Sequence, residues 1–205
     1  GFGGAGVLTM ANDASVQAPA LIVGQFGVLS GEGSIAGNLT NIGLVAPGDE
    51  AIGALHVAGA YTQQPGGVLE IDLGGNSAIH ADFLDVGAAT LDGVLKLQSI
   101  PGSILPTNTV LSATSLTGQF SNVASGQRLS LFNGGGSFLV FYGPGSPFNP
   151  NDIVLTSFLP NLLAGDFDQD GDVDGTDFLL WQRGGSPMPN SPEDLATWQA
   201  NFGLS

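Results

Sequence analysis

Short apolar stretches recur along the first 160 residues and are separated by Gly, Asn, Asp or Pro. In one of them Leu69, Ile71 and Leu73 alternate with Glu70 and Asp72, as in a strand that buries one face. Many short strands joined by Gly-rich turns predict an all-β body. The expected strands are residues 6–10, 20–23, 27–30, 44–46, 54–63, 68–73, 83–86, 89–98, 109–113, 128–132, 138–142 and 153–158.

Good helical signals appear only after Gly165, where the chain contains a short internal repeat. Residues 177–182, DFLLWQ, recur as residues 194–199, DLATWQ. The second helix is expected to begin after Ser191, a favourable N-cap, with Pro192 at its first position. The two helices are expected to pack through four aromatic side chains, Phe178, Trp181, Trp198 and Phe202.

A Pro-rich segment separates these two kinds of pattern. Residues 143–164 contain four Pro before the first helical signal. We therefore place a domain boundary near Pro160, between an all-β body of residues 1–160 and a small helical module of residues 161–205. The linker is short, so the module is expected to dock on the body.

The composition narrows the range of partners. The 205 residues include 3 Lys and Arg and 18 Asp and Glu, for a formal net charge of −15. This balance argues against nucleic acid and anionic membranes, which both require clustered basic residues. No apolar run approaches the roughly 20 residues of a membrane span. Charged residues make up 10% of the chain, against about 25% in typical soluble domains, which suggests that much of the surface packs against something.

Residues 166–177, DFDQDGDVDGTD, concentrate the acidic charge and have the spacing of an EF-hand calcium loop. Calcium requires six to eight oxygen ligands, and a curled loop brings alternate side chains together. Gly171 occupies the sharp turn and Val173 is expected to anchor the loop. Asp172 would act through its backbone carbonyl, Asp174 through a water, and Asp177 as a bidentate ligand. The predicted metal residues are Asp166, Asp168, Asp170, Asp172, Asp174 and Asp177.

The loop and the repeat that follows it resemble a type I dockerin module, especially those at the C-termini of surface proteins of planctomycete-like bacteria. The resemblance implies calcium binding and a cohesin-like receptor as partner. The second loop, GGSPMPNSPED, departs from the dockerin pattern because it lacks the acidic ligands. One calcium ion is therefore expected instead of two.

Residues 30–125 resemble the β-helical stretch of autotransporter passengers. The resemblance is carried by Ala46-Pro47-Gly48, by residues 59–63 and 66–71, and by residues 82–86. It implies a β-solenoid, a right-handed β-helix, for this part of the body. From the residues alone, a β-sandwich or jelly roll remains the alternative. The N-terminal segment GFGGAGVLTMANDASV is either an ordinary first strand or a strand added to a neighbouring subunit.

Candidate catalytic residues are few. His56 and His80 lie apart in β-rich segments and are expected to be structural. Glu70 and Asp72 share a strand face and could imitate a glycosidase pair, but a solvated outer face is the simpler interpretation. No phosphate loop, zinc motif or nucleophile elbow occurs. We expect no enzyme activity.

Together these features predict an extracellular or cell-surface, calcium-binding structural protein that assembles with itself into a fibre, layer or matrix. One alternative is a dockerin-type module that attaches a β-helical adhesin to a cohesin-like receptor. A weaker alternative is a carbohydrate-binding or carbohydrate-active protein, with a cell-surface polysaccharide as partner.

Overall fold

The computed structural model describes residues 5–48, 51–75, 79–160, 163–168 and 171–204. The chain forms two compact units. The first, here called the body, comprises Gly1–Phe132 and Phe138–Phe158. The second, here called the C-terminal module, comprises Asn133–Ser137 and Leu159–Ser205.

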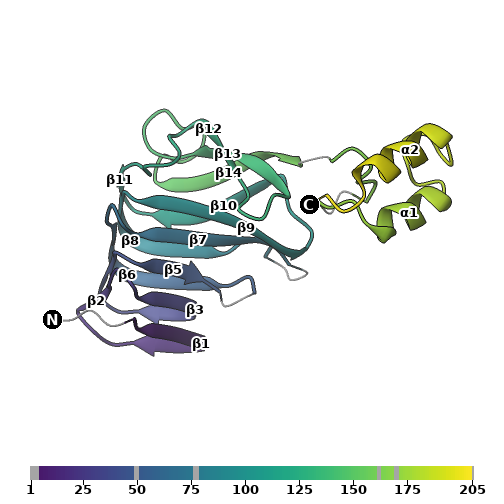
Figure 1. The fold of residues 1–205 in the computed structure, drawn as a ribbon. Coiled ribbons are helices and arrows are strands. Elements are labelled where there is room, and N and C mark those ends of the chain that lie inside the picture. Colours follow the sequence, from purple (N-terminus) through teal and green to yellow (C-terminus); the bar gives the residue numbers. More distant parts are fainter. Residues whose placement is uncertain (1–4, 49–50, 76–78, 161–162, 169–170, 205) are drawn as a thin grey trace. The chain divides into compact units, whose positions relative to one another are not determined.

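Within the described residues, one sheet joins fourteen strands and curls around a common core (Figure 1). This confirms the prediction of an all-β body. The strands are β1 (Val7–Val16), β2 (Ala20–Val23), β3 (Val28–Ile35), β4 (Asn38–Asn41), β5 (Leu44–Pro47), β6 (Ala54–Gln63), β7 (Val68–Gly75), β8 (Phe83–Leu91), β9 (Val94–Gly102), β10 (Thr107–Ala113), β11 (Leu116–Gly118), β12 (Gln127–Ser130), β13 (Gly136–Phe141) and β14 (Asp152–Pro160).

Parallel pairing aligns the inward side chains in three columns. Neighbouring strands place residues of like position side by side, so each apolar side chain is covered by the one in the next strand. The first column is Leu8, Leu29, Val45, Leu69 and Leu95. The second is Ala14, Leu55, Leu84 and Leu111, with Gly33 at the aligned position between Ala14 and Leu55. The third is Leu21, Leu39, Tyr61, Ala89 and Leu116.

The parallel stack ends where the chain turns back on itself. β14 pairs antiparallel with β10, with Leu111 opposite Ile153, and β13 and β12 follow at that edge of the sheet. Phe120 and Phe138 are fully buried near this end of the chain's core. The last strands therefore cover an edge that the parallel pattern would otherwise leave open.

Two strands were not predicted from the sequence, and one predicted strand is divided between two strands of the structure. β4 and β11 were not predicted, because each has a single Leu between polar residues and glycines. The single strand expected at residues 89–98 is two strands, since Asp92 and Gly93 form a corner. Gly93 has φ +60°, and a Cβ there would lie 2.3 Å from the carbonyl oxygen of Gly67, so only glycine fits this turn.

The C-terminal module contains the two predicted helices, α1 (Gly175–Gln182) and α2 (Pro192–Asn201). Their aromatic contact is also confirmed, because the ring of Phe178 lies 5.6 Å from Trp181 and 4.9 Å from Trp198. Phe202 contacts Trp198 at 5.1 Å but remains 59% exposed. Neither helix of the described chain is long and apolar enough to cross a membrane.

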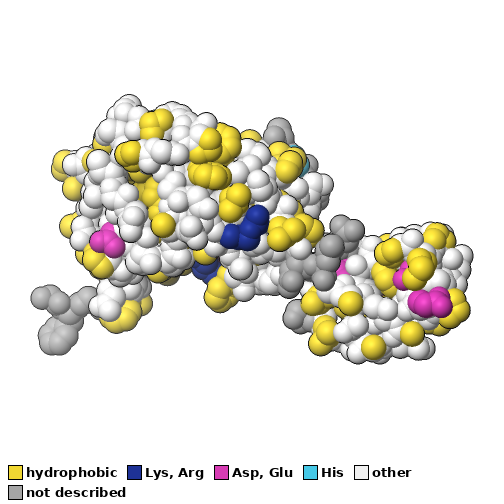
Figure 2. Space-filling view, turned by 90° about the horizontal axis from the view of Figure 1, so that it is seen from above, with side chains coloured by type: hydrophobic (Ala, Val, Ile, Leu, Met, Phe, Trp, Pro, Cys, Tyr) yellow, Lys and Arg dark blue, Asp and Glu magenta, His cyan; other side chains and the backbone are white. Residues whose placement is uncertain are grey.

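The surface of the body reflects the low content of charged residues. The face shown in Figure 2 carries mainly hydrophobic and neutral side chains, with few charged groups between them. One ion pair on the body joins Lys96 to Glu70, and the Lys96 ammonium group also lies 4.3 Å from the centre of the Phe132 ring.

Candidate metal centre

Asp177 is the central hydrogen-bond acceptor of the acidic loop, which runs into the first turn of α1. Its carboxylate is fully buried. Oδ1 accepts hydrogen bonds from the backbone N–H groups of Phe167 (2.6 Å) and Asp168 (3.1 Å), and Oδ2 accepts one from Asp174 (2.8 Å). Three backbone donors thus curl the loop around one carboxylate at the first turn of the helix.

The loop also turns sharply at the predicted glycine. Gly171 has φ +100°, a conformation that favours glycine, and its N–H donates to Oδ2 of Asp166 at 3.1 Å. Asp166 is itself buried. The first predicted ligand, Asp166, therefore accepts a hydrogen bond from the turn at Gly171. The last, Asp177, accepts hydrogen bonds from the start of the loop.

The described carboxylates form two groups that share Asp177. Asp166, Asp168 and Asp177 bring ligand oxygens within 4.8 Å of one another, and so do Asp172, Asp174 and Asp177. Either group could hold a metal ion, and an all-oxygen donor set suits hard cations. Asp170, the remaining predicted ligand, lies outside the described residues.

The hydrogen bonds restrict how Asp177 could bind an ion. A carboxylate offers about four lone-pair sites, and backbone N–H groups use two on Oδ1 and one on Oδ2. Counting the described residues alone, one site on Oδ2 remains for a metal. Monodentate binding fits this arrangement, whereas the bidentate binding expected from the sequence would require the N–H of Phe167 or Asp168 to move away.

Asp174 and Asp172 each have contacts that the EF-hand spacing did not predict. Asp174 is the N-cap of α1, with Oδ1 accepting from the Thr176 N–H at 2.6 Å in a capping box with Asp177. The carboxylate of Asp172, whose backbone carbonyl is the expected ligand, lies with the second carboxylate group. The start of the helix thus stabilises the negative charge of these carboxylates.

Contacts from the end of the chain hold the loop in place. Val173 is fully buried, as predicted for the loop anchor. Its N–H donates to the Leu204 carbonyl (2.9 Å), and its carbonyl accepts from the Gly203 N–H (2.7 Å). The Trp198 indole N–H donates to the Asp174 carbonyl at 2.7 Å. α2 and the residues after it therefore fix the backbone that presents the carboxylates.

The second half of the repeat keeps the capping geometry without the carboxylate cluster. Ser191 caps α2 and accepts from the Asp194 N–H at 3.0 Å. Asp194 is buried, and Oδ2 accepts from the Met188 N–H at 2.7 Å. Asp194 thus closes its own loop with a backbone hydrogen bond, much as Asp177 does in the first loop.

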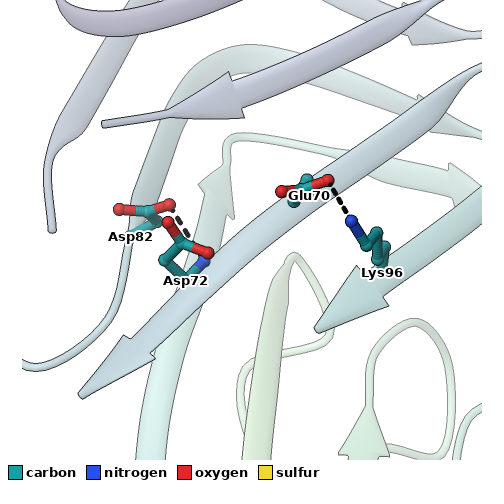
Figure 3. Close-up of polar contacts among 4 residues, drawn as sticks. All are labelled: Glu70, Asp72, Asp82 and Lys96. Atoms are coloured by element: carbon teal, nitrogen blue, oxygen red, sulfur yellow. Dashed lines mark hydrogen bonds and ion pairs between the residues drawn. The ribbon is translucent and has the colours of Figure 1, made fainter. Parts of the chain in front are cut away.

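On β7, the Glu70 side chain and the Asp72 backbone make structural contacts (Figure 3). Glu70 Oε2 forms the 2.8 Å ion pair with Lys96 of β9. The Asp72 backbone N–H donates to Oδ2 of Asp82 at 3.0 Å, while Oδ1 of Asp82 accepts from the Gly53 N–H at 2.9 Å. Asp82 therefore ties the segment before β6 to β7 and to the start of β8.

Burial changes the acidity of two of these carboxyl groups. Desolvation raises the pKa of Asp82 to about 8, against the opposing effect of the hydrogen bonds from the Asp72 and Gly53 N–H groups, and the charges of Asp72 and Glu70 add smaller increases. Desolvation and the nearby Glu70 raise the pKa of Asp72 to about 6, against the opposing effect of Lys96. Sequence reasoning missed Asp82, because no local pattern signals that a single acid before a strand is buried.

The two histidines lie in separate places, as expected. His56 Nδ1 lies 2.7 Å from Oδ2 of Asp85 on the neighbouring strand, and both side chains are about half exposed. His80 Nδ1 lies 3.1 Å from the Ser103 carbonyl oxygen. The first contact joins the neighbouring strands β6 and β8, and the second joins the segment before β8 to the residue after β9.

No protein-family model, no curated protein and no solved structure matches this chain. The resemblances to dockerins and to autotransporter passengers therefore stay predictions, carried by the residues quoted for them.

Proposed function

We propose that the protein is a non-enzymatic, calcium-binding structural protein of the cell exterior, and that copies of it assemble through the edges of a β-solenoid body. The solenoid assignment is supported by the parallel registers. Equivalent residues of successive layers, such as Leu55, Leu84 and Leu111, lie side by side, and three such columns fill the core.

The observation that carries the assembly proposal is the uncovered first layer of this stack. Among the described residues, β1 pairs only with β3, and β2 only with β4. Each layer of a solenoid is covered by its neighbours, and an uncovered end exposes backbone groups that readily pair with another chain. The low charge of the body favours the same packing.

The carboxylate groups around Asp177 support calcium as the ion. Six acidic side chains with oxygen ligands at EF-hand spacing suit calcium better than softer metals. Asp at the last position, in place of Glu, has a shorter reach, and we expect an affinity toward the weak, extracellular end of the EF-hand range. Binding would order the module where calcium is plentiful.

The first test is the size of particles formed by the full chain, measured by light scattering and negative-stain microscopy. We expect large assemblies with calcium and their loss with excess chelator. Asp166→Ala should prevent assembly even with calcium, because it removes a buried carboxylate that braces the loop at Gly171. Asp85→Ala, which removes an exposed carboxylate from the body, is the matched control and should assemble. Small particles under every condition would overturn the proposal.

A second candidate function is attachment of the body to a receptor through the C-terminal module. It is favoured by the apolar side chains that the module exposes, namely Leu179, Met188, Phe202 and Leu204. Exposed apolar groups of this kind often mark protein contacts. Under this alternative the pure protein would stay small with calcium and would bind a cohesin-like protein, so the same particle measurement separates the two functions.

A further inference from the structure

The first layer of the body presents an apolar groove beside β1, whose only strand partner among the described residues is β3. The groove has a volume of about 290 Å³ and is lined by residues 6–8, 21–24 and 27–29. Three large apolar side chains of the same layer project outward, Val7 at 71%, Ile22 at 65% and Phe26 at 64% exposure. Val7 and Ile22 line the groove, and Phe26 is an exposed side chain of the same layer that could enter such a groove.

At the other end of the stack, later residues of the chain pair with several strand edges, while β12 at the end of the sheet pairs only with β13 among the described strands. β14 covers β10. The Asn151 side chain accepts from the Leu116 N–H and donates to the Thr114 carbonyl, so it pairs with the edge at β11. The Asn122 side chain does the same for both backbone groups of Leu95 in β9. These edges cannot receive the first layer of another copy without losing existing hydrogen bonds.

The charge of the first layer also restricts its partner. The first 48 residues contain two acids, Asp13 and Glu32, and no Lys or Arg, although the whole chain has a net charge of −15. No charged residue lines the groove. A charged partner would be desolvated here without a counter-charge, whereas a neutral apolar edge matches the surface. The first layer of a second copy is such a neutral, apolar edge, and it is present wherever the protein is.

We propose that two copies of the chain pair through their first layers about a two-fold axis, with β1 of one copy antiparallel to β1 of the other. Phe26 of each copy enters the groove of its partner and contacts Val7 and Ile22, which line that groove. A contact between identical surfaces closes on itself, so this interface makes a dimer. It rests on the assembly function proposed above and specifies its first step, because a larger fibre or layer then requires a second contact elsewhere on the chain.

The first experiment measures the dimer dissociation constant of the full chain by sedimentation velocity, with chelator present. β1 and β2 contribute no residue to the carboxylate loop, so we expect the dimer to persist without calcium. The double variant Val7→Lys with Ile22→Lys places like charges on both sides of the contact and should raise the dissociation constant at least about tenfold. Leu105→Lys places the same charge at an exposed apolar position elsewhere on the body (40% exposed). This control should leave the dissociation constant unchanged.

The second experiment tests the symmetry. The chain contains no Cys, so single cysteines can be placed at the exposed positions Val7, Thr9, Ala11 and Ser15 of β1. Disulfides require Cα atoms about 4.4–6.8 Å apart. In a two-fold antiparallel pair, only a position close to the axis meets its own copy. We therefore expect one short part of β1 to give disulfide-linked dimers and the rest of the series to give none.

The outcomes separate this inference from the proposed function. A dimer that persists with chelator, while larger particles never form, supports the two-fold contact and overturns assembly beyond it. A strict monomer, an unchanged dissociation constant in the double Lys variant, or no cross-link anywhere along β1 would overturn the two-fold contact. Calcium-dependent polymers that survive the double Lys variant would show that assembly uses other surfaces.

Discussion

At the scale of single residues, the carboxyl group of Asp82 couples the stability of the body to pH. It is 1% exposed, and burial raises its pKa to about 8, whereas an Asp in an unfolded chain has a pKa of about 3.9. Between these values the folded state binds more protons than the unfolded state. The free energy of unfolding therefore decreases as pH rises through this window.

We predict that the stabilisation linked to Asp82 is fully present below about pH 4 and is lost as pH rises toward 8, with a slope of at most about 1.4 kcal/mol per pH unit. Asp72, with a pKa raised to about 6, adds an effect of the same sign over a narrower range. Urea unfolding followed by far-UV circular dichroism from pH 5 to 8 measures the slope.

Asp82→Asn should flatten this slope, because the buried titrating group is gone even if the variant is less stable overall. Asp85→Asn removes an exposed carboxylate of the same body and serves as the control for the lost charge. A slope that is equal in the wild type and in Asp82→Asn would contradict the assignment.

The two acidic sites differ in how far the sequence reveals them. The ligands around Asp177 lie within twelve consecutive residues, so their spacing alone predicts that they converge. The partners of Asp82 are Gly53 and Asp72, which approach it only because the chain stacks layer on layer. Even in the metal loop, the share of the Asp177 lone pairs taken by backbone N–H groups was not predictable from the spacing.

At the scale of structural elements, a buried polar network joins β4 and β6. The Tyr61 hydroxyl donates to Oε1 of Gln63 (2.5 Å) and accepts from Nδ2 of Asn41 (3.2 Å). Gln63 and Asn41 extend the network to the backbone carbonyls of Val94 and Val68. All three side chains are buried, and burial raises the pKa of Tyr61, so the neutral hydroxyl links successive layers of the sheet.

We predict that Tyr61→Phe lowers the free energy of unfolding by about 1–3 kcal/mol, although it keeps the ring, because two buried amide groups lose a partner. Thr62→Val removes a hydroxyl from the next residue, which faces outward and is partly exposed, and should change stability by no more than about 0.5 kcal/mol. Equal effects of the two variants in urea unfolding would show that the network contributes little.

Among the elements, long alternating segments were predictable and corners were not. The burial of Leu69, Ile71 and Leu73 follows directly from their alternation with polar residues. β4 offers one buried Leu between Asn and Thr, and it is a strand because β2 and β6 lie on either side of it. Short strands of this kind are defined by their neighbours in the stack, which no local pattern contains.

At the scale of the whole molecule, the two compact units should respond differently to calcium. The carboxylate groups that could hold an ion lie in the C-terminal module. A ligand that binds only the folded form of one unit stabilises that unit, by about 2.7 kcal/mol at a concentration one hundred times its dissociation constant. The body has no described residue in these groups and should gain nothing directly.

The two tryptophans make this difference measurable, because Trp181 and Trp198 both lie in the module whereas Tyr61 and Tyr142 lie in the body. We predict that calcium raises the unfolding midpoint seen by tryptophan fluorescence and leaves the midpoint of the β signal in circular dichroism unchanged. Asp166→Ala should abolish the fluorescence shift, and magnesium should reproduce it only weakly, since it requires a smaller, near-octahedral oxygen cage. A calcium shift in both signals would mean that the units unfold as one, and no shift in either would exclude the loop as a calcium site.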